Sequence, residues 1–169
     1  MFIFNLQFLL LLISFLCMIV RKYTPSDCNE IINLFYNTVH IINAKDYSKD
    51  QLDVWATEQI DFEKWNESLQ KHYSLVAIYN EIIVGFGDID YLGYIDRLYV
   101  HHDYQGKGIG TEICNKLEEK VSGCTISVHA SITARPFFEK RGYVVVEELQ
   151  TIRGGIALIN YFMTKNSES

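Results

Sequence analysis

The chain has 169 residues, 49% of them hydrophobic and 14% aromatic, and carries a formal net charge of -6. This length fits a single domain with a sizeable core, and the apolar content excludes an intrinsically disordered chain. The acidic balance disfavours nucleic acid as a partner, because phosphate contacts need clustered Lys and Arg side chains. A cationic, amine-bearing substrate would suit that charge.

Residues 1–17 form an apolar extension ahead of a domain expected at 18–166. The stretch 2–20 has no charged side chain, which is typical of a membrane span, and the Arg and Lys that follow would keep the domain on the cytoplasmic side. A helix ending at Met18 would be only about 25 Å long, short of a hydrocarbon core of about 30 Å. Because Met18 is also an in-frame start, we favour a mis-called or non-essential extension over an anchor. A cytoplasmic protein is therefore expected, and membrane association requires residues 1–17.

Three helices are expected next. Apolar residues recur at three- and four-residue steps over 24–42, after a Thr-Pro start that suits a helix N-terminus. Ser48 and Asp61 are N-cap residues before two shorter helical patterns. Trp55 and Trp65 lie on these two helices. Either could line a substrate pocket, and packing in the core is the alternative for both.

The pattern then changes to period two, which indicates β-strands. The expected strands lie at 74–79, 82–89, 94–100, 124–130, 144–149 and 156–163, with another at 19–23. Asn80 and Glu81 should form a hairpin turn between the first two of these strands. In the central strand, alternation should place Ile95, Arg97 and Tyr99 on one face, and Tyr94, Asp96, Leu98 and Val100 on the other.

A glycine-rich loop joins the central strand to a helix expected at 111–121. Gly106, Gly108 and Gly110 remove side chains where backbone must approach a ligand, and the helix directs its unpaired N–H groups toward the loop. These are the parts of a phosphate cradle. The string contains no Walker loop, because Lys107 lies between glycines, and its third glycine comes one residue too early for the dinucleotide fingerprint.

Two motifs resemble those of the GNAT superfamily of N-acetyltransferases. The string Gln105-x-x-Gly108-x-Gly110, preceded by Leu-Tyr-Val, resembles the family's acyl-CoA loop. Residues 131–143, S-I-T-A-R-P-F-F-E-K-R-G-Y, resemble its N-x-x-A-x-x-F-Y-E-K-x-G-F segment. The resemblance covers nearly everything over 18–165. It implies a single GNAT-type α/β (α+β) domain, with a mixed, mostly antiparallel sheet of six to seven strands and helices on both faces.

The resemblance also implies the activity, which is direct transfer of an acetyl group from acetyl-CoA to a primary amine. The residues implied to hold the pyrophosphate are Gln105, Gly106, Lys107, Gly108, Ile109 and Gly110, and those implied to pair with the pantetheine are Leu98, Tyr99 and Val100. Ser131 and Phe138 would also lie near the cofactor. They depart from the family pattern, in which Asn and Tyr are usual at these places.

The departure at Phe138 bears on the leaving group, because the family's Tyr is usually credited with protonating the CoA thiolate. A phenyl ring donates no proton. Tyr161, Tyr99 or His129 would replace that Tyr here, or the thiolate leaves unaided. The second route is chemically tolerable, since a thiol with a pKa of about 8.5 is a fair leaving group near neutrality.

A base is the harder requirement. A primary amine has a pKa of about 10.4, so presenting it uncharged at neutral pH costs roughly 4.6 kcal/mol. We expect Asp96 to take the proton, directly or through a water, because family members often carry an acid at this place on the central strand. Asp88 and Asp90 would attract the cation, and Trp55 would contribute to the acceptor pocket. The alternatives are that Asp96 pairs with Arg97 and that Asp90 merely ends a strand.

The cysteines and histidines show no metal-binding pattern. The four cysteines contain no C-x-x-C pair, and we interpret them as reduced thiols, with Cys28 and Cys114 in helix cores. His101 and His102 are neighbours on an extended segment, so they should point to opposite faces and make a poor chelate. No metal site is expected.

Two other function classes stay open. The missing Tyr at position 138 leaves a non-catalytic acyl-CoA-binding sensor or regulatory module as the alternative, and a membrane-tethered interaction protein is the third class. The acceptor is also open among small amines, aminoglycosides, peptide N-termini and protein lysines. Related proteins often dimerise through the terminal strand, which adds a homodimer to the expected partners.

Overall fold

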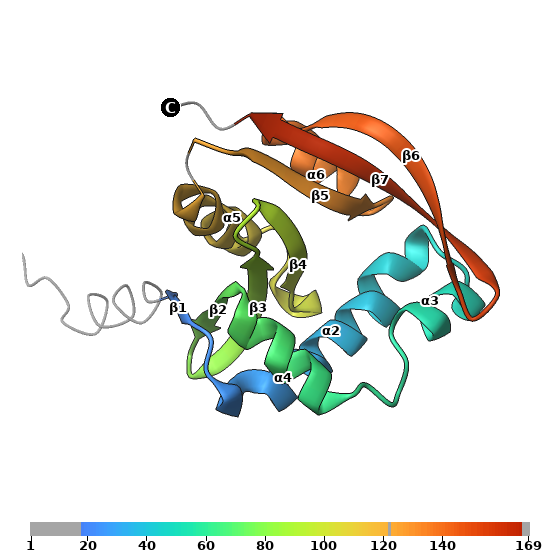
Figure 1. Ribbon diagram of the computed structural model, residues 1–169. Helices are drawn as coiled ribbons and strands as arrows, with labels where there is room; N and C mark the ends of the chain where they lie inside the picture. Colours follow the sequence, from blue (N-terminus) through green and yellow to red (C-terminus); the bar gives the residue numbers. More distant parts are fainter. Residues whose placement is uncertain (1–17, 122, 167–169) are drawn as a thin grey trace, which may run out of the picture.

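A computed structural model describes residues 18–121 and 123–166, which form a seven-stranded sheet (Figure 1). The strands are β1 (Ile19–Lys22), β2 (Tyr73–Tyr79), β3 (Ile82–Ile89), β4 (Tyr94–Val100), β5 (Thr125–Ser131), β6 (Val144–Arg153) and β7 (Ile156–Asn166). Their order in the sheet is β1-β2-β3-β4-β5-β7-β6. Only the β4–β5 pair among them is parallel. The predicted mixed, mostly antiparallel sheet is confirmed.

Helices cover both faces of this sheet, as predicted. They are α2 (Cys28–Ile42), α3 (Lys49–Trp55), α4 (Phe62–Lys71), α5 (Ile109–Lys120) and α6 (Arg135–Lys140). The neighbouring residues Leu75 and Val76 show the two layers, because they point to opposite faces of β2. Leu75 belongs to the buried cluster under α5 and α6, and Val76 to the cluster under α2, α3 and α4.

The predicted helix starts are confirmed at their caps. Ser48 accepts a hydrogen bond from the Gln51 amide at the start of α3, and Asp61 accepts one from the Lys64 amide at the start of α4. These side chains satisfy N–H groups that a helix leaves without a partner in its first turn. Cys28 and Cys114 are fully buried, as the helical patterns predicted.

The expectations for residues 1–17 fall outside the described part of the chain. Within residues 18–121 and 123–166, no helix combines the length and apolar character that a membrane crossing requires. The first described strand, β1, pairs with β2 at the edge of the sheet. Arg21 holds this end of the chain through a two-pronged contact with Asp27, at 2.7 and 2.8 Å.

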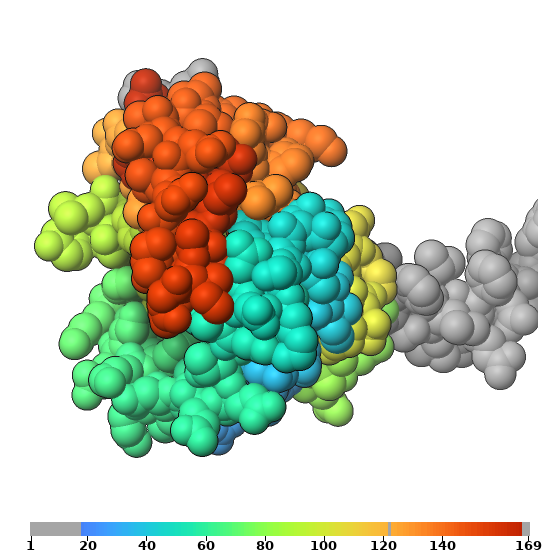
Figure 2. Space-filling model, turned by 90° about the vertical axis from the view of Figure 1, so that its right-hand side faces the viewer, coloured from blue at the N-terminus to red at the C-terminus, as the bar shows by residue number. Residues whose placement is uncertain are grey.

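The C-terminal hairpin is longer than the sequence predicted. Strands β6 and β7 continue past the expected ends at 149 and 163 to Arg153 and Asn166. The turn at Gly154 and Gly155 takes positive φ angles of 54° and 80°, which glycine adopts without strain. Figures 1 and 2 show the tip of this hairpin lying against α3.

Hydrogen bonds fix the hairpin on the helical layer. The Tyr47 hydroxyl donates to the Ile159 carbonyl at 2.7 Å, and the Gln51 side-chain amide donates to the Ala157 carbonyl at 2.8 Å. A Cβ added at Gly154 would lie 3.2 Å from Val54 Cγ1, so the turn packs closely on α3. The hairpin therefore forms a fixed wall beside the helices.

The edge of the sheet at this end belongs to β6. The terminal strand β7 is paired on both sides, with β5 and with β6, so it presents no free edge. Val144, Val146 and Ile152 on β6 are each more than half exposed. The homodimer remains a prediction, and the strand edge open to it is that of β6.

One expectation about the central strand was wrong. Ile95 does not share a face with Arg97 and Tyr99, because the β3–β4 register shifts between these positions: Asp88 lies opposite Arg97, and Ile89 lies opposite Ile95. Ile95 packs in the cluster under α5 and α6. Asp96 is thus the extra residue of a β-bulge, a device that bends a strand and re-aims its side chains.

Candidate functional site

Strands β4 and β5 separate and leave a cavity between them. They are paired at two positions only, Tyr94 with Ser127 and Ile95 with Val128. Beyond these pairs the strands diverge around a cavity of about 210 Å³. Its lining includes nine of the predicted site residues: Trp55, Asp96, Leu98, Tyr99, Val100, Gln105, Gly110, Ser131 and Phe138. We call this space the inter-strand cavity.

The glycine loop has the geometry of an anion cradle. Gly106 and Gly108 take positive φ angles of 72° and 79°, and a Cβ at either would meet nothing within 4 Å. The first backbone bond of α5 runs from the Glu112 amide to the Gly108 carbonyl at 3.0 Å. The N–H groups of the first helical turn therefore have no partner within the helix, and they lie beside open space.

Side chains of the loop bind its backbone and the preceding turn. Gln105 Nε2 donates to the Val100 carbonyl at 2.6 Å, which fixes the loop to the end of β4. Lys107 Nζ donates to the Asp103 carbonyl at 3.3 Å and lies 4.4 Å from the Tyr104 ring centre. Ile109 is 4% exposed and packs under the helix. In this arrangement Gln105 and Ile109 support the loop, and the backbone N–H groups face its open side.

Asp96 lines the inter-strand cavity at the β-bulge of β4. Its carboxylate is 37% exposed and stands 3.1 Å from Arg97 Nη2. Burial raises the pKa of Asp96, the Arg97 charge opposes this rise, and the Asp88 charge adds to it. The ion pair with Arg97 that the sequence left open is therefore present, and it leaves part of the carboxylate facing the cavity.

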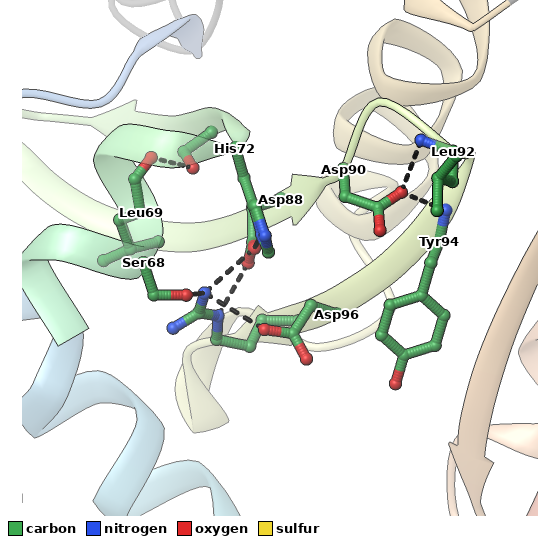
Figure 3. A network of polar contacts seen from close by, with 10 residues as sticks. Ser68, Leu69, His72, Asp88, Asp90, Leu92, Tyr94 and Asp96 are labelled. Carbon is green, nitrogen blue, oxygen red and sulfur yellow. Dashed lines mark hydrogen bonds and ion pairs between the residues drawn. The ribbon is translucent and has the colours of Figure 1, made fainter. Parts of the chain in front are cut away.

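Asp88 and Asp90 do not line the inter-strand cavity with Asp96. Figure 3 shows the polar contacts that the two acids make. Asp88 is fully buried and is bound by Arg97 Nε at 2.8 Å and by His72 Nδ1 at 2.6 Å. Asp90 accepts the amides of Leu92 and Tyr94, both at 2.8 Å, and closes the β3–β4 turn. These contacts occupy both carboxylates, and the attraction of an amine by Asp88 and Asp90 stays a prediction.

The network behind Asp96 fixes its partner Arg97. Arg97 Nη2 donates to Ser68 Oγ at 2.6 Å and to Asp88 Oδ2 at 3.0 Å (Figure 3). Its guanidinium lies 5.2 Å from the Trp65 ring centre. An arginine held by several partners has one orientation. Arg97 therefore sets where the Asp96 carboxylate stands. Trp65 packs in the core, and Trp55 lines the cavity.

We expect replacement of His72 with Gln to change the pH dependence of stability. The hydrogen bond to Asp88 raises the pKa of His72 above its ordinary 6.5. Charged His72 therefore stabilises the fold below about pH 6.5, and this contribution is lost as the pH rises through the raised value. Urea unfolding should show His72→Gln less stable by about 1.5 kcal/mol at pH 5.5, with the difference shrinking at higher pH. A difference that stays constant from pH 5.5 to 9 would contradict this assignment.

Ser131 and Phe138 lie at the other side of the cavity. Ser131 Oγ accepts the Ala134 amide at 3.0 Å and shapes the turn before α6. Phe138 is 2% exposed and packs edge-on against Phe137 and Tyr143. The Ser131 hydroxyl therefore stabilises the local turn, and the Phe138 ring contributes an apolar wall.

The three proposed proton donors are in different places. Tyr99 and His129 line the inter-strand cavity, and Tyr161 lies under Arg135, 4.5 Å from its guanidinium. Burial raises the pKa of Tyr99 far above its ordinary value, although the Trp55 hydrogen bond and the Arg153 charge oppose this. The His129 ring stands between the rings of Tyr94 and Phe162. Position thus favours Tyr99 and His129 over Tyr161.

A second cavity adjoins the first. It shares Trp55, Asp96, Tyr99, His129 and Ser131 with the inter-strand cavity. Its other lining residues are Tyr47, Tyr94, Thr151, Arg153, Leu158, Ile159 and Asn160. We call it the hairpin cavity, because β6 and β7 form one wall. Asp96 borders both spaces.

The histidine pair was wrongly predicted to point to opposite faces. The rings of His101 and His102 stack with their centres 4.1 Å apart, because the chain leaves the extended conformation after His101 and begins a 3-10 turn. With Asp103 they form a group whose donor atoms all lie within 4.8 Å. Nitrogen lone pairs lie in the ring planes, so stacked rings direct them side by side and do not converge on one ion.

Sequence patterns did not identify several lining residues. Thr38 on α2 donates to the Val100 carbonyl at 3.1 Å and borders the inter-strand cavity with Asn43. Arg153 and Asn160 border the hairpin cavity. The signal for Thr38 was available, because a polar residue stands on the apolar stripe of α2. Nothing in the sequence brings the C-terminal hairpin to Asp96.

Comparison with known proteins identifies the family of this fold. The family model described as an acetyltransferase (GNAT) domain matches residues 43–165. The uncharacterized N-acetyltransferase YafP of Escherichia coli K12 is 34% identical over 145 residues, covering 85% of this chain and 93% of YafP.

Two solved structures extend the comparison. The GCN5-related N-acetyltransferase (aminotransferase, class II) of Rhodopseudomonas palustris is 33% identical, with a TM-score of 0.84, covering 88% of this chain and 95% of that one. The PaiA N-acetyltransferase of Thermoplasma acidophilum, solved with coenzyme A, is 20% identical, with a TM-score of 0.70, covering 89% and 99%. The family model, the YafP match and the Rhodopseudomonas structure together show that this chain belongs to the GNAT family of acetyltransferases.

Proposed function

We propose that this protein transfers an acetyl group from acetyl-CoA to a primary amine by direct attack. The observation that carries the proposal is one continuous cavity bordered both by the glycine loop, at Gln105 and Gly110, and by the Asp96 carboxylate. A diphosphate cradle and a base at the same opening are what amine acetylation requires.

The residues present fit acetyl-CoA as co-substrate. The open space at Gly106 and Gly108 lets backbone N–H groups approach an anion, and the N-terminus of α5 adds its partial positive charge. The diverging edge of β4 at Leu98–Val100 borders the cavity, where peptide groups can pair with pantetheine amides. The PaiA relative was solved with coenzyme A, which supports the same cofactor here. When bound, acetyl-CoA supplies the activated acyl group.

Asp96 is the proposed base, acting directly or through a water. Its raised pKa makes it a stronger base than an exposed carboxylate. Arg97 holds the carboxylate toward the cavity and opposes a larger rise of its pKa. The attacking amine would lose its proton to Asp96, and no cysteine is needed as a covalent carrier.

The thiolate leaves unaided, or with a proton from Tyr99 or His129, because Phe138 has none to give. The Phe at position 138 also leaves an acyl-CoA sensor as a second candidate function, since an acyl-CoA binder needs no proton donor.

The cytoplasm is the proposed compartment. Among the described residues, Cys28, Cys114 and Cys124 carry free thiols.

Thiol release from acetyl-CoA across a panel of amines tests the proposal. We expect release with at least one amine, together with a rise in melting temperature when CoA is added. A rise in melting temperature without thiol release for any amine would favour the sensor. The absence of both thiol release and a thermal shift would exclude both functions.

A further inference from the structure

The hairpin cavity contains one acidic and one basic side chain that are suited to opposite ends of a small molecule. Asp96 lies where this cavity meets the inter-strand cavity, and Arg153 stands at the end of β6. Among the described residues, the Arg153 guanidinium has no ion pair and no side-chain hydrogen bond. Within this cavity it therefore remains available to an anion.

The Arg153 charge influences two other residues of the cavity lining. Burial raises the pKa of Tyr94 to about 12, and the Arg153 charge opposes that rise. It opposes the rise at Tyr99 in the same way. A charge that acts on two phenols of the lining stands near the cavity, although Arg153 itself belongs to the exposed hairpin.

Asn160 adds a buried acceptor atom to the same lining. Its Nδ2 donates to Thr151 Oγ1 at 2.7 Å, which fixes the amide, and its Oδ1 is buried without a hydrogen-bond partner among the described residues. A buried polar atom that lacks a partner is costly, and a ligand N–H removes that cost. Asp96 and Asn160 are acceptors suited to an ammonium group, and Arg153 is suited to an anion.

We infer that the acceptor is a small molecule with both an amine and a carboxylate, an amino-acid-like zwitterion whose carboxylate binds Arg153 while its amine faces Asp96. This inference rests on the proposed acetyl transfer and names its substrate class. The planar guanidinium matches a carboxylate with two parallel hydrogen bonds. A diamine or polyamine fits poorly, because its second cation would lie near Arg153. A lysine side chain of a protein brings no anion to this place.

The chemistry of transfer is balanced without another reactant. The amine nitrogen forms a bond to the acetyl carbon, the carbon–sulfur bond of the thioester breaks, and the electron pair leaves on the sulfur. The amine proton goes to Asp96 and then to solvent. The carboxylate of the acceptor takes no part and is a handle for binding.

The test compares acceptors in matched pairs. Each protein amino acid, with β-alanine and 4-aminobutyrate, is compared with its own primary amide, and KM and kcat are measured by thiol release from acetyl-CoA. We expect at least one acid to exceed its amide about tenfold or more in kcat/KM. Arg153→Gln should raise KM for that acid about tenfold or more and leave KM for the amide within about twofold.

Control variants separate the contact from the general charge. Lys64→Gln removes one positive charge from a side chain that is 82% exposed on α4, and it should change neither KM. Arg153→Lys should retain part of the preference, because the charge stays while the planar fork is lost. The inference would be overturned if the amides were acetylated with the same kcat/KM as the acids. It would also be overturned if Arg153→Gln raised KM equally for acids and amides.

Failure of the inference and of the proposed function give different results. If CoA raises the melting temperature and amides are acetylated while acids are not, only the inference fails. If no acceptor causes thiol release from acetyl-CoA, the proposed acetyl transfer fails. Calorimetry then measures how tightly the CoA-bound protein binds each acid and its amide, and this comparison tests the inference. Acids that then bind more tightly than their amides would support it, and acids that bind no more tightly would overturn it.

Discussion

Replacing Asp96 with Asn is expected to lower kcat/KM about 100- to 1,000-fold near neutral pH, because general base catalysis contributes roughly this factor. The amide keeps the shape of the carboxylate and cannot take a proton. The variant should regain rate as the pH rises toward about 10.4, where a primary amine loses its proton to solvent. Steady-state thiol release from pH 6 to 10 measures both effects.

The matched control for this result is Asp103→Asn, which makes the same change at a carboxylate that is 73% exposed. It should act within about twofold of the wild type. Coenzyme A should bind Asp96→Asn as tightly as the wild type, since the acid is not part of the glycine loop. Turnover by Asp96→Asn within threefold of the wild type at pH 7 would remove Asp96 from the mechanism.

Replacing Gly110 with Glu is expected to weaken coenzyme A binding by about 100-fold or more while the protein stays folded. A Cβ at Gly110 would lie 3.6 Å from both Phe137 and Val100, an ordinary contact, so the larger side chain would extend along the inter-strand cavity. Its negative charge would stand at the first turn of α5, where the diphosphate is expected, and would repel it. Calorimetric titration with CoA measures the loss.

Two controls bracket this prediction. Gly110→Ala adds the Cβ alone and should leave the melting temperature near that of the wild type. Thr111→Glu places the same charge one residue along the helix on an exposed side chain and should weaken CoA binding only a few-fold. If the Gly110→Glu variant bound CoA as tightly as the wild type, the cofactor would have to bind elsewhere. The basis of the proposed function would then be removed.

The backbone of the site could be predicted from the sequence because its signals are local. The strands at Ile82–Ile89 and Tyr94–Val100 end where the period-two pattern ends. Asn80 and Glu81 take positive φ angles of 48° and 65°, as a tight hairpin turn requires. The glycine loop is likewise recognised from the spacing of its glycines, and the helix after it from the spacing of its apolar residues.

The side-chain arrangement could not be predicted, because it depends on contacts between distant segments. Strict alternation cannot show the bulge at Asp96, which inserts one residue and reverses the face of Ile95. Asp88 and Asp90 share a strand, but Arg97 and His72 bind one of them while a turn binds the other. The pattern of charges alone does not distinguish an acid bound in the core from one facing a cavity.

The C-terminal hairpin has a consequence for how this protein can diverge. The walls suited to the acceptor come from β6, β7 and α3, whereas the cradle suited to the cofactor lies at the end of β4 and the start of α5. Under the proposed function, mutations in the hairpin tip are therefore expected to alter which acceptor is chosen and to leave the affinity for coenzyme A unchanged. Selection can act on the two specificities separately, and homologues with an altered tip should exchange acceptors more readily than cofactors.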